Sequence, residues 1–451
     1  MFYENISILD FVLLPFYLGL IYAIAFNIRH RHYPKGHPWR KYFIPALTLK
    51  IVGAVFIGLI YFYYYKGGDT YNYFYQAQII NSSLNDSIGK WVNLLLHIPG
   101  NLDGEYYQYI SLMEWYNDPA SYAVVSITAF TSLFTFNTYL PAAVIFAFIS
   151  FSGIWALFRT FARLYPHLIR PIAVAVLFIP SVFVWGSGIF KDTVCLFALG
   201  WLTYSTIRFL MHQDYSFRNI IIAILSFTLI ASVKLYILLG FVPALGMWIL
   251  FNYSQKIKNR GAKFVVKIFF ATVTIGAFLF FMQGFGESLG KYSLEKIAAT
   301  SQTTGQYLYY ISGDEGSAYN LGNFSPSIGS MITKFPAAVN VTFFRPYIWE
   351  SKKIIVLLSA IEALLFLFLT IKILFSIGPV KIWKTISTDP TIQFCLVFSI
   401  IFAFAVGISS YNFGTLSRYK IPCLPFYALA LIMIYYKNKS LKNKLFRPLN
   451  I

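Results

Sequence analysis

The chain has 451 residues, of which 58% are hydrophobic, 20% aromatic and only 12% charged, and its formal net charge is +19. Soluble domains carry about 25% charged residues, so this composition excludes an ordinary soluble enzyme, and its hydrophobicity excludes a disordered chain. Three cysteines are too few for a disulfide-stabilised secreted domain. We therefore assign the excess of Lys and Arg to the loops of a membrane protein and expect no nucleic-acid partner.

Long apolar runs recur along the whole chain. A helix needs about 20 mostly apolar residues to cross a bilayer, and by that measure we predict an all-α, polytopic integral membrane protein with about eleven transmembrane helices. The whole chain, residues 1–451, is expected to form a single transmembrane domain. The predicted spans lie near residues 7–27, 43–65, 139–158, 171–187, 191–209, 219–233, 235–252, 264–283, 354–375, 391–409 and 420–436.

Three further segments complete the predicted organisation. Residues 121–136 are apolar but short and rich in Ser and Thr, and we expect a re-entrant or half-buried helix there. Residues 66–120 and 284–353 are the two large segments predicted on the extracytoplasmic side. Both are longer than the usual loop of about 12–15 residues, so we expect them to be folded and functional.

The charge of the loops predicts the orientation. If residues 28–42 are cytoplasmic, every loop assigned to that side is basic, with Asp214 and Asp389 as the acids among them. Cytoplasmic loops of membrane proteins carry an excess of Lys and Arg. We therefore predict an N-terminus outside and a C-terminus in the cytoplasm. Counting residues 121–136 as a full crossing would move the most basic loops outside.

Four groups of polar residues fall on the predicted outer side. The first reads KGGDTY at residues 66–71 and directly follows the second span, and its two glycines permit a tight turn at the membrane surface. A carboxylate held there can accept the proton of a hydroxyl group, which makes Asp69 the candidate catalytic base. The alternative is a helix boundary, at which Asp69 caps the following helix.

The second group reads WGSGIFKD at residues 185–192 and leads from a glycine-rich turn into the next span. Helix N-termini attract anions and Lys191 adds positive charge, so Lys191 and Asp192 are candidate ligands for a phosphate-bearing substrate. Lys234, in the predicted outer turn between two spans, is a third candidate. The alternative is that Asp192 caps its helix while the two lysines anchor their spans at the interface.

The third group reads FFRPYIWE at residues 343–350, and its charged residues are Arg345 and Glu350. They are candidate substrate ligands, or else a surface ion pair of little energetic value. The fourth reads YNFGTLSRYKIP at residues 411–422 and opens the last span. The planar fork of Arg418 matches phosphate oxygens, and Tyr419 beside it is a further candidate ligand. We expect Arg418 to share one cavity with Lys191 and Lys234.

One carboxylate, several cations and many aromatic rings are thus predicted at one membrane face. The carboxylate can accept a hydroxyl proton, cations stabilise a departing phosphate, and aromatic rings stack on sugars. The combination suits a lipid-linked phosphate that carries a sugar. The sequence contains no nucleotide-binding, serine-hydrolase or zinc-protease motif and no evident metal ligands. We expect no cofactor, and a divalent metal requirement stays open.

The segment RYKIPCLP at residues 418–425 resembles the RYxxPxxP segment that opens a late span in polytopic glycosyltransferases of the GT-C superfamily. Within that superfamily, the segment resembles in particular the protein mannosyltransferases and the aminoarabinose transferases. Residues 68–70, Gly-Asp-Thr, resemble the acidic site in the first large outer loop of that family. The resemblance implies a GT-C-like fold with Asp69 as base and Arg418 as a contact to the lipid phosphate.

The resemblance also implies a reaction and a place. The donor would be a polyprenyl-phosphate-linked sugar, and the acceptor a glycan, lipid or protein. Transfer would invert the configuration at the anomeric centre of the sugar. It would take place on the extracytoplasmic face of a bacterial inner (cytoplasmic) membrane, where membrane lipids surround the protein. The product would belong to the synthesis of cell-envelope polysaccharides. The composition, rich in Phe, Tyr, Ile and Lys, is also similar to that of multi-span proteins of Bacteroidetes.

Two features depart from the family pattern. The acidic residue follows the second span rather than the first, and the usual Asp-Glu pair is here a single Asp69 followed by Thr70. The late loop is also similar to those of O-antigen polymerases and ligases, which act on lipid-linked glycans and rely on outer arginines such as Arg345 and Arg418. A lipid or glycan transporter is a further alternative, although transporters gather polar groups at the membrane midplane.

Overall fold

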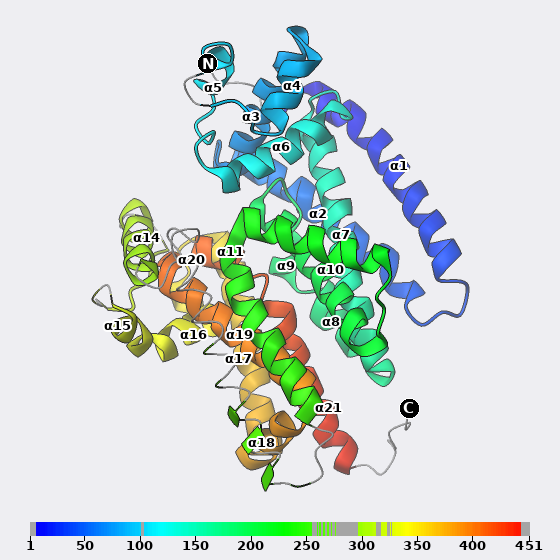
Figure 1. Cartoon of the computed structure of the whole chain (residues 1–451), viewed down its shortest axis with the longest axis vertical. Helices are drawn as coiled ribbons and strands as arrows, with labels where there is room; N and C mark the ends of the chain where they lie inside the picture. The colour runs from blue at the N-terminus through cyan, green and yellow to red at the C-terminus, as the bar shows by residue number, and fades with distance from the viewer. Residues whose placement is uncertain are drawn as a thin grey trace. The chain divides into compact units, whose positions relative to one another are not determined.

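The computed structural model describes residues 6–442, apart from residues 101–102, 313–316, 323–324, 326 and most of 255–295. Regular structure in the described part is helical, and one isolated β-bridge joins Ala318 to Asn412. The fold is therefore all-α, as the sequence predicts. The chain divides into two compact units, Met1–Leu235 and Tyr236–Ile451 (Figure 1).

The first unit is built around α7 (Tyr139–Leu164), which is buried over most of its length. It packs against α1 (Ile8–His32), α2 (Arg40–Tyr63) and α10 (Lys191–His212). The shorter helices of the unit are α3 (Asp69–Ser82), η1 (Ser83–Asn85), α4 (Ile88–Leu95), α5 (Tyr107–Ile110), α6 (Pro119–Leu133), η2 (Pro166–Leu168), α8 (Ile169–Leu177) and α9 (Pro180–Trp185). The long α11 (Phe217–Ser254) begins in this unit and ends in the second.

Two glycines bring α7 and α10 together at backbone distance. A Cβ added to Gly200 would overlap the carbonyl oxygen of Gly153, and a Cβ added to Gly153 would overlap that of Phe197. Lipid tails are as apolar as the side chains of membrane helices, so the hydrophobic effect does not drive these helices together. They associate instead through close packing at small residues such as glycine. The contact joins the middle of α10, the helix that begins with two predicted site residues, to α7.

The second unit is built around α19 (Pro390–Ser410), which packs against α14 (Ile297–Ser312), α16 (Phe335–Phe344) and α21 (Leu424–Lys442). The hydroxyl group of Thr342 in α16 donates to the carbonyl oxygen of Ala403 in α19 at 2.8 Å. The other helices of the unit are α15 (Ile328–Thr333), η4 (Ile348–Glu350), α17 (Ile354–Ile377), α18 (Pro379–Thr388) and α20 (Phe413–Tyr419).

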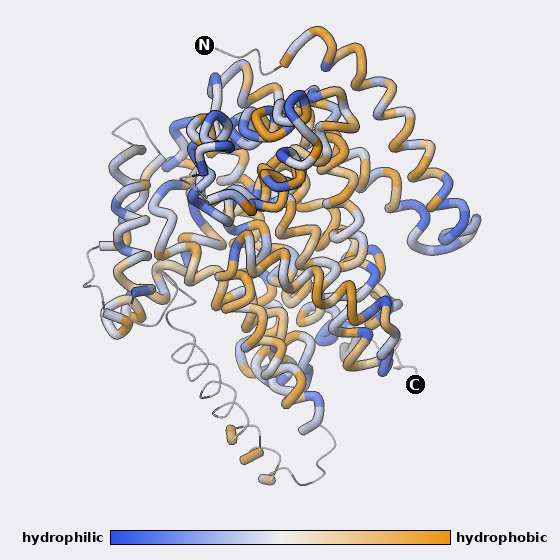
Figure 2. The backbone as a smooth tube through the Cα atoms, turned by 45° about the horizontal axis from the view of Figure 1, so that its top comes forward, coloured by the Kyte–Doolittle hydropathy of each residue, from blue (hydrophilic) through white to orange (hydrophobic). Residues whose placement is uncertain are grey.

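The exposed faces of the long helices are apolar. On α17, Leu358, Leu365 and Phe368 are more than 40% exposed, whereas Glu362 on the same helix is buried. Figure 2 shows that α1 is apolar over most of its length and hydrophilic at its C-terminal end and in the loop that leads to α2. A soluble helix turns its charged residues outward, so this inverted pattern indicates helices that face lipid.

Within the described residues, seven helices are long and apolar enough to cross a membrane, or eight if the bent pair α20 and α21 forms one span. Ten of the eleven predicted crossings fall within the described residues, so the predicted number is too high for this part of the chain. Residues 171–187 form the two short helices α8 and α9, because the extended Ile179 and the proline after it end the first helix. The predicted span at 264–283 lies mostly outside the described residues.

The predicted spans 219–233 and 235–252 together make up α11. Lys234 between them has non-helical backbone angles, φ −146° and ψ 74°, so the predicted turn is present as a break within one helical run. The apolar segment 121–136 contains α6, which at 15 residues extends about 22 Å. That is shorter than the bilayer core of about 30 Å and agrees with the predicted half-buried helix. The predicted outer segment 66–120 is folded and includes α3, α4 and α5.

Cysteine labelling tests the predicted orientation. The three native cysteines are buried, so they should contribute little background labelling. A Lys35→Cys variant, in the exposed α1–α2 loop, should be protected from an impermeant thiol reagent applied to intact cells. A Glu105→Cys variant, exposed in the segment after α4, should be labelled. Permeabilised cells, in which both sites should react, are the control, and the opposite pattern would reverse the orientation.

Candidate functional site

Asp69 is the first residue of α3 and lies just beyond the C-terminal end of the α2 span. The residues before it, Lys66, Gly67 and Gly68, have φ angles of 53°, 139° and 121°. Glycine adopts such angles without a steric penalty, and a Cβ at Gly68 would also strike the ring of Tyr61. The turn therefore fixes the direction of α3 and holds Asp69, half-buried, at the N-terminus of that helix.

The two residues after Asp69 fasten α3 to the long helices. The hydroxyl oxygens of Thr70 and Tyr139 are 2.6 Å apart, and the hydroxyl group of Tyr71 donates to the carbonyl oxygen of Gly58 at 2.8 Å. Thr70 and Tyr71 are buried, so Asp69 stands on a rigid support while part of its side chain stays accessible. This geometry is compatible with both predicted roles, a helix boundary and a base held at the end of a span.

Lys191 begins α10 and forms an ion pair with Asp118, whose Oδ2 is 3.1 Å from the lysine Nζ. Asp118 is the N-cap of α6 and accepts hydrogen bonds from the backbone of Ala120 and the hydroxyl group of Ser121. Burial raises the pKa of Asp118, but the Ser121 hydrogen bond and the Lys191 charge more than offset it, so this pKa lies below its ordinary value. An Asp-Pro sequence before an apolar run is a local signal for a helix N-cap and predicts the capping role of Asp118. No such local signal predicts the ion pair of Asp118 with Lys191.

Asp192 and Lys234 form a buried ion pair. The lysine Nζ is 2.5 Å from Oδ1 of Asp192, whose side chain is fully buried, and Lys234 is 6% exposed. Removing two charges from water is costly, so such a pair persists only where charge and geometry match closely. The structure thus brings together two of the predicted site residues, one at the N-terminus of α10 and one at the break in α11.

In the second unit, Arg345 and Glu350 form a bidentate ion pair. The Nε atom of Arg345 is 3.1 Å from both carboxylate oxygens. The rings of Tyr319, Tyr347 and Phe413 lie 5.3–6.0 Å from the guanidinium carbon. Burial raises the pKa of Glu350, but Arg345 outweighs that effect, and the pKa lies below its ordinary value. Both side chains are 21% exposed, so this pair is more enclosed than the predicted surface pair.

Arg418 lies in α20 and is 8% exposed, with its guanidinium carbon 5.9 Å from the centre of the Tyr419 ring. The side chain of Asn412 caps this helix by accepting a hydrogen bond from the Thr415 backbone at 2.9 Å. Phe413, the first residue of α20, is one of the rings beside Arg345. Helix α20 therefore links the two groups of predicted site residues in the second unit.

Buried charges inside the long helices are the residues that sequence reasoning missed. Lys50 in α2 is only 2% exposed, and its Nζ donates to the Ser150 hydroxyl at 3.0 Å and the Gly186 carbonyl at 2.5 Å. Asp10 in α1 is equally buried and accepts a hydrogen bond from the Leu140 backbone at 2.7 Å. No local signal predicts these contacts, because their partners are distant in sequence.

Glu362 in α17 carries a formal charge in the middle of an apolar helix and is only 5% exposed. The charge of this carboxylate acts on Lys420, which is 1% exposed at the bend between α20 and α21. Both residues belong to the second unit. Both side chains are therefore buried within the protein and away from lipid, as expected for ionisable groups in a membrane span.

The seven or eight long apolar helices found among the described residues, with their exposed apolar surfaces, define this chain as a polytopic α-helical membrane protein. Within the described residues, no three His, Cys, Asp or Glu side chains are grouped to hold a metal ion. Comparisons with protein-family models, with curated protein sequences and with solved structures found no match to the chain. Its function must therefore be argued from its own residues.

Proposed function

We propose that the protein is a membrane glycosyltransferase, which moves a sugar from a polyprenyl-phosphate donor to a hydroxyl group of a glycan, lipid or protein acceptor on the extracytoplasmic face. The observation that carries the proposal is the setting of Asp69, which is half-buried on a fixed turn just beyond the end of the α2 span. A polyprenyl tail stays in the lipid, so its phosphate and sugar react at the depth where a span ends.

In the proposed reaction, the acceptor oxygen attacks the anomeric carbon from the face opposite the phosphate. A carbon–oxygen bond to the acceptor forms while the bond from the anomeric carbon to the phosphate oxygen breaks, and the configuration inverts. Asp69 takes the proton of the acceptor hydroxyl. Arg418 holds the phosphate oxygens with its planar fork and stabilises the polyprenyl phosphate that leaves. The ring of Tyr419 stacks on a sugar.

The remaining candidate residues have supporting roles in this proposal. Lys191 adds positive charge at the N-terminus of α10, where an anion is favoured, and Asp118 moderates that charge. The buried pair of Asp192 and Lys234 fixes the break in α11. Arg345, oriented by Glu350, offers a second guanidinium group for a glycan or its phosphate.

The second candidate function is a polymerase or ligase that joins lipid-linked glycans. The observation that favours it is the enclosed guanidinium group of Arg345, which lies among three aromatic rings next to the helix that carries Arg418. Arginine and aromatic rings together suit a phosphorylated glycan. In that reaction both substrates are lipid-linked, whereas a transferase needs only one lipid-linked donor.

Transfer of a radiolabelled sugar by the purified full-length chain tests the proposal. A panel of polyprenyl-phosphate-linked sugars is offered with cell-envelope glycans, lipids and peptides, and we expect labelled product from at least one donor with a single lipid-linked substrate. Arg418→Lys should lower turnover about tenfold or more, because the charge stays and the bidentate fork is lost. The matched control is Arg218→Lys, an exposed arginine, which should keep full activity.

Two results would count against these assignments. Wild-type turnover in Arg418→Ala would remove this arginine from the site. Product formed only when two lipid-linked glycans are supplied would identify the polymerase instead of the transferase.

A further inference from the structure

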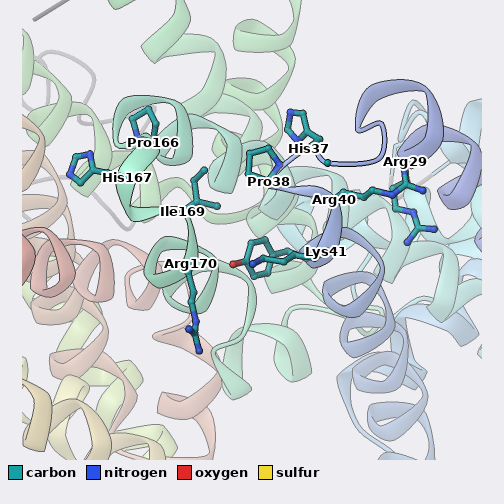
Figure 3. A pocket seen from close by; sticks show the side chains of 11 residues that line it. Arg29, His37, Pro38, Arg40, Lys41, Pro166, His167, Ile169 and Arg170 are labelled. Carbon is teal, nitrogen blue, oxygen red and sulfur yellow. The ribbon is translucent and has the colours of Figure 1, made fainter. Parts of the chain in front are cut away.

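A second cluster of charged residues lies at the opposite end of α2 from Asp69. The loop between α1 and α2 and the connection between α7 and α8 line an open cavity of about 600 Å³ (Figure 3). Its volume lies within the range of about 300–1,000 Å³ that is usual for small-molecule sites. The cavity belongs to the first unit, and its basic lining residues are Arg29, His37, Arg40, Lys41, His167 and Arg170.

The lining of the cavity is basic and contains no carboxylate. In the part of the chain that the structure describes, the four Arg and Lys side chains of the cavity form no ion pair. Figure 3 shows that they come from two sides, with Arg29 and Arg40 on one and Arg170 on the other. Positive charges gathered around an open space, without a protein anion among them, favour an anionic ligand.

The side chain of Arg29 provides a second, independent observation that favours an anionic ligand. Its Nε atom is buried and has no hydrogen-bond partner within the described chain. The positive charge of Arg40 also acts on Arg29, so two like charges are held near each other. Arg40 is fixed by a hydrogen bond from Nη1 to the carbonyl oxygen of Tyr33 at 2.5 Å. A buried donor without a partner is unfavourable, and an anion in the cavity would offset the repulsion between the two guanidinium groups.

The position of the cavity indicates what kind of anion it receives. Arg29 is in the last turn of α1, Arg40 opens α2, and Arg170 follows the end of α7, so three spans end at this level. Residues at the ends of spans meet the headgroups of the bilayer. Guanidinium forks match phosphate oxygens in pairs, and basic pockets between membrane helices bind phosphorylated headgroups.

We propose that this cavity binds a phosphate group at headgroup level, carried by an anionic phospholipid or by a soluble phosphate. The site is separate from the proposed transferase site, because α2 has 24 residues and so places the cavity about 36 Å from its far end, next to Asp69. The inference therefore holds or fails independently of the proposed function. In the predicted orientation, the cavity opens on the cytoplasmic side.

The test is the binding of two probes to the purified full-length chain in neutral detergent, followed by native mass spectrometry. One probe is phosphatidylglycerol and the other is inorganic pyrophosphate. The cavity variant is Lys41→Gln/Arg170→Gln, in which both replaced side chains are exposed and the fold should persist. The control is Arg31→Gln/Lys35→Gln, which removes the same charges from exposed residues of the α1–α2 region that do not line the cavity.

The wild type and the control should bind one phosphatidylglycerol molecule with similar affinity, and the cavity variant should bind it at least about tenfold more weakly. A third variant, Arg29→Gln, should show a similar loss. Binding of phosphatidylglycerol alone supports a lipid headgroup, and binding of pyrophosphate as well supports a soluble phosphate ligand. Equal losses in the cavity and control variants, or no binding of either probe to the wild type, would overturn the inference.

Discussion

Asp69→Asn should abolish sugar transfer, with a rate loss of about 10²–10⁴-fold, while folding and donor binding stay normal. Asparagine has the same size and fits the first position of α3, but it cannot accept a proton. The hydrogen bonds of Thr70 and Tyr71 that fasten α3 to the long helices are made by their own hydroxyl groups. The measurement is single-turnover transfer from a saturating donor, which separates the chemical step from binding.

The matched control for Asp69 is Glu105→Gln, which neutralises an exposed carboxylate in the same segment between α2 and α6. It should retain wild-type turnover. If Asp69→Asn keeps full activity while Arg345→Ala and Arg418→Ala abolish it, Asp69 is not the base. The arginine-dependent polymerase then becomes the better explanation of the site.

Asp192→Asn should destabilise the protein by about 3–5 kcal/mol, because it leaves the Lys234 ammonium group buried without its counter-charge. The double variant Asp192→Asn/Lys234→Met removes both charges and should recover most of the stability. Lys191→Met provides the comparison, because its partner Asp118 is 47% exposed and such a pair contributes about 0–1 kcal/mol. Thermal unfolding of the purified variants, followed by intrinsic fluorescence, measures all three.

The double variant also separates a structural pair from a substrate contact. Recovery of both stability and transfer activity would show that Asp192 and Lys234 hold the break in α11 and do not touch the substrate. Recovery of stability with lasting loss of activity would assign them to substrate binding. Wild-type stability in Asp192→Asn would contradict the argument from the buried charge.

The two units contribute different chemistry to the proposal. The first unit carries the carboxylate Asp69 and the cation Lys191, and the second carries Arg345 and Arg418, each near aromatic rings. A transferase of the proposed kind needs a base for the acceptor and cations for the leaving phosphate. The Asp69 and Arg418 variants therefore test the contributions of the two units separately.

The sequence by itself determined the membrane class and most of the long helices. The bilayer sets the length of an apolar run, so α1, α2, α7, α10, α17 and α19 could be predicted without knowledge of their neighbours. A local signal, two adjacent glycines, also predicted the turn before Asp69.

Only the tertiary structure decided how the chain is broken and which charges are paired. Hydropathy averages over a window, so it did not register the interruption at Pro180. Asp118 and Lys191 are 73 residues apart, and Asp192 and Lys234 are 42 apart. Their attraction acts over a few ångströms of space, which local sequence patterns do not encode, so packing of the helices alone selects these partners.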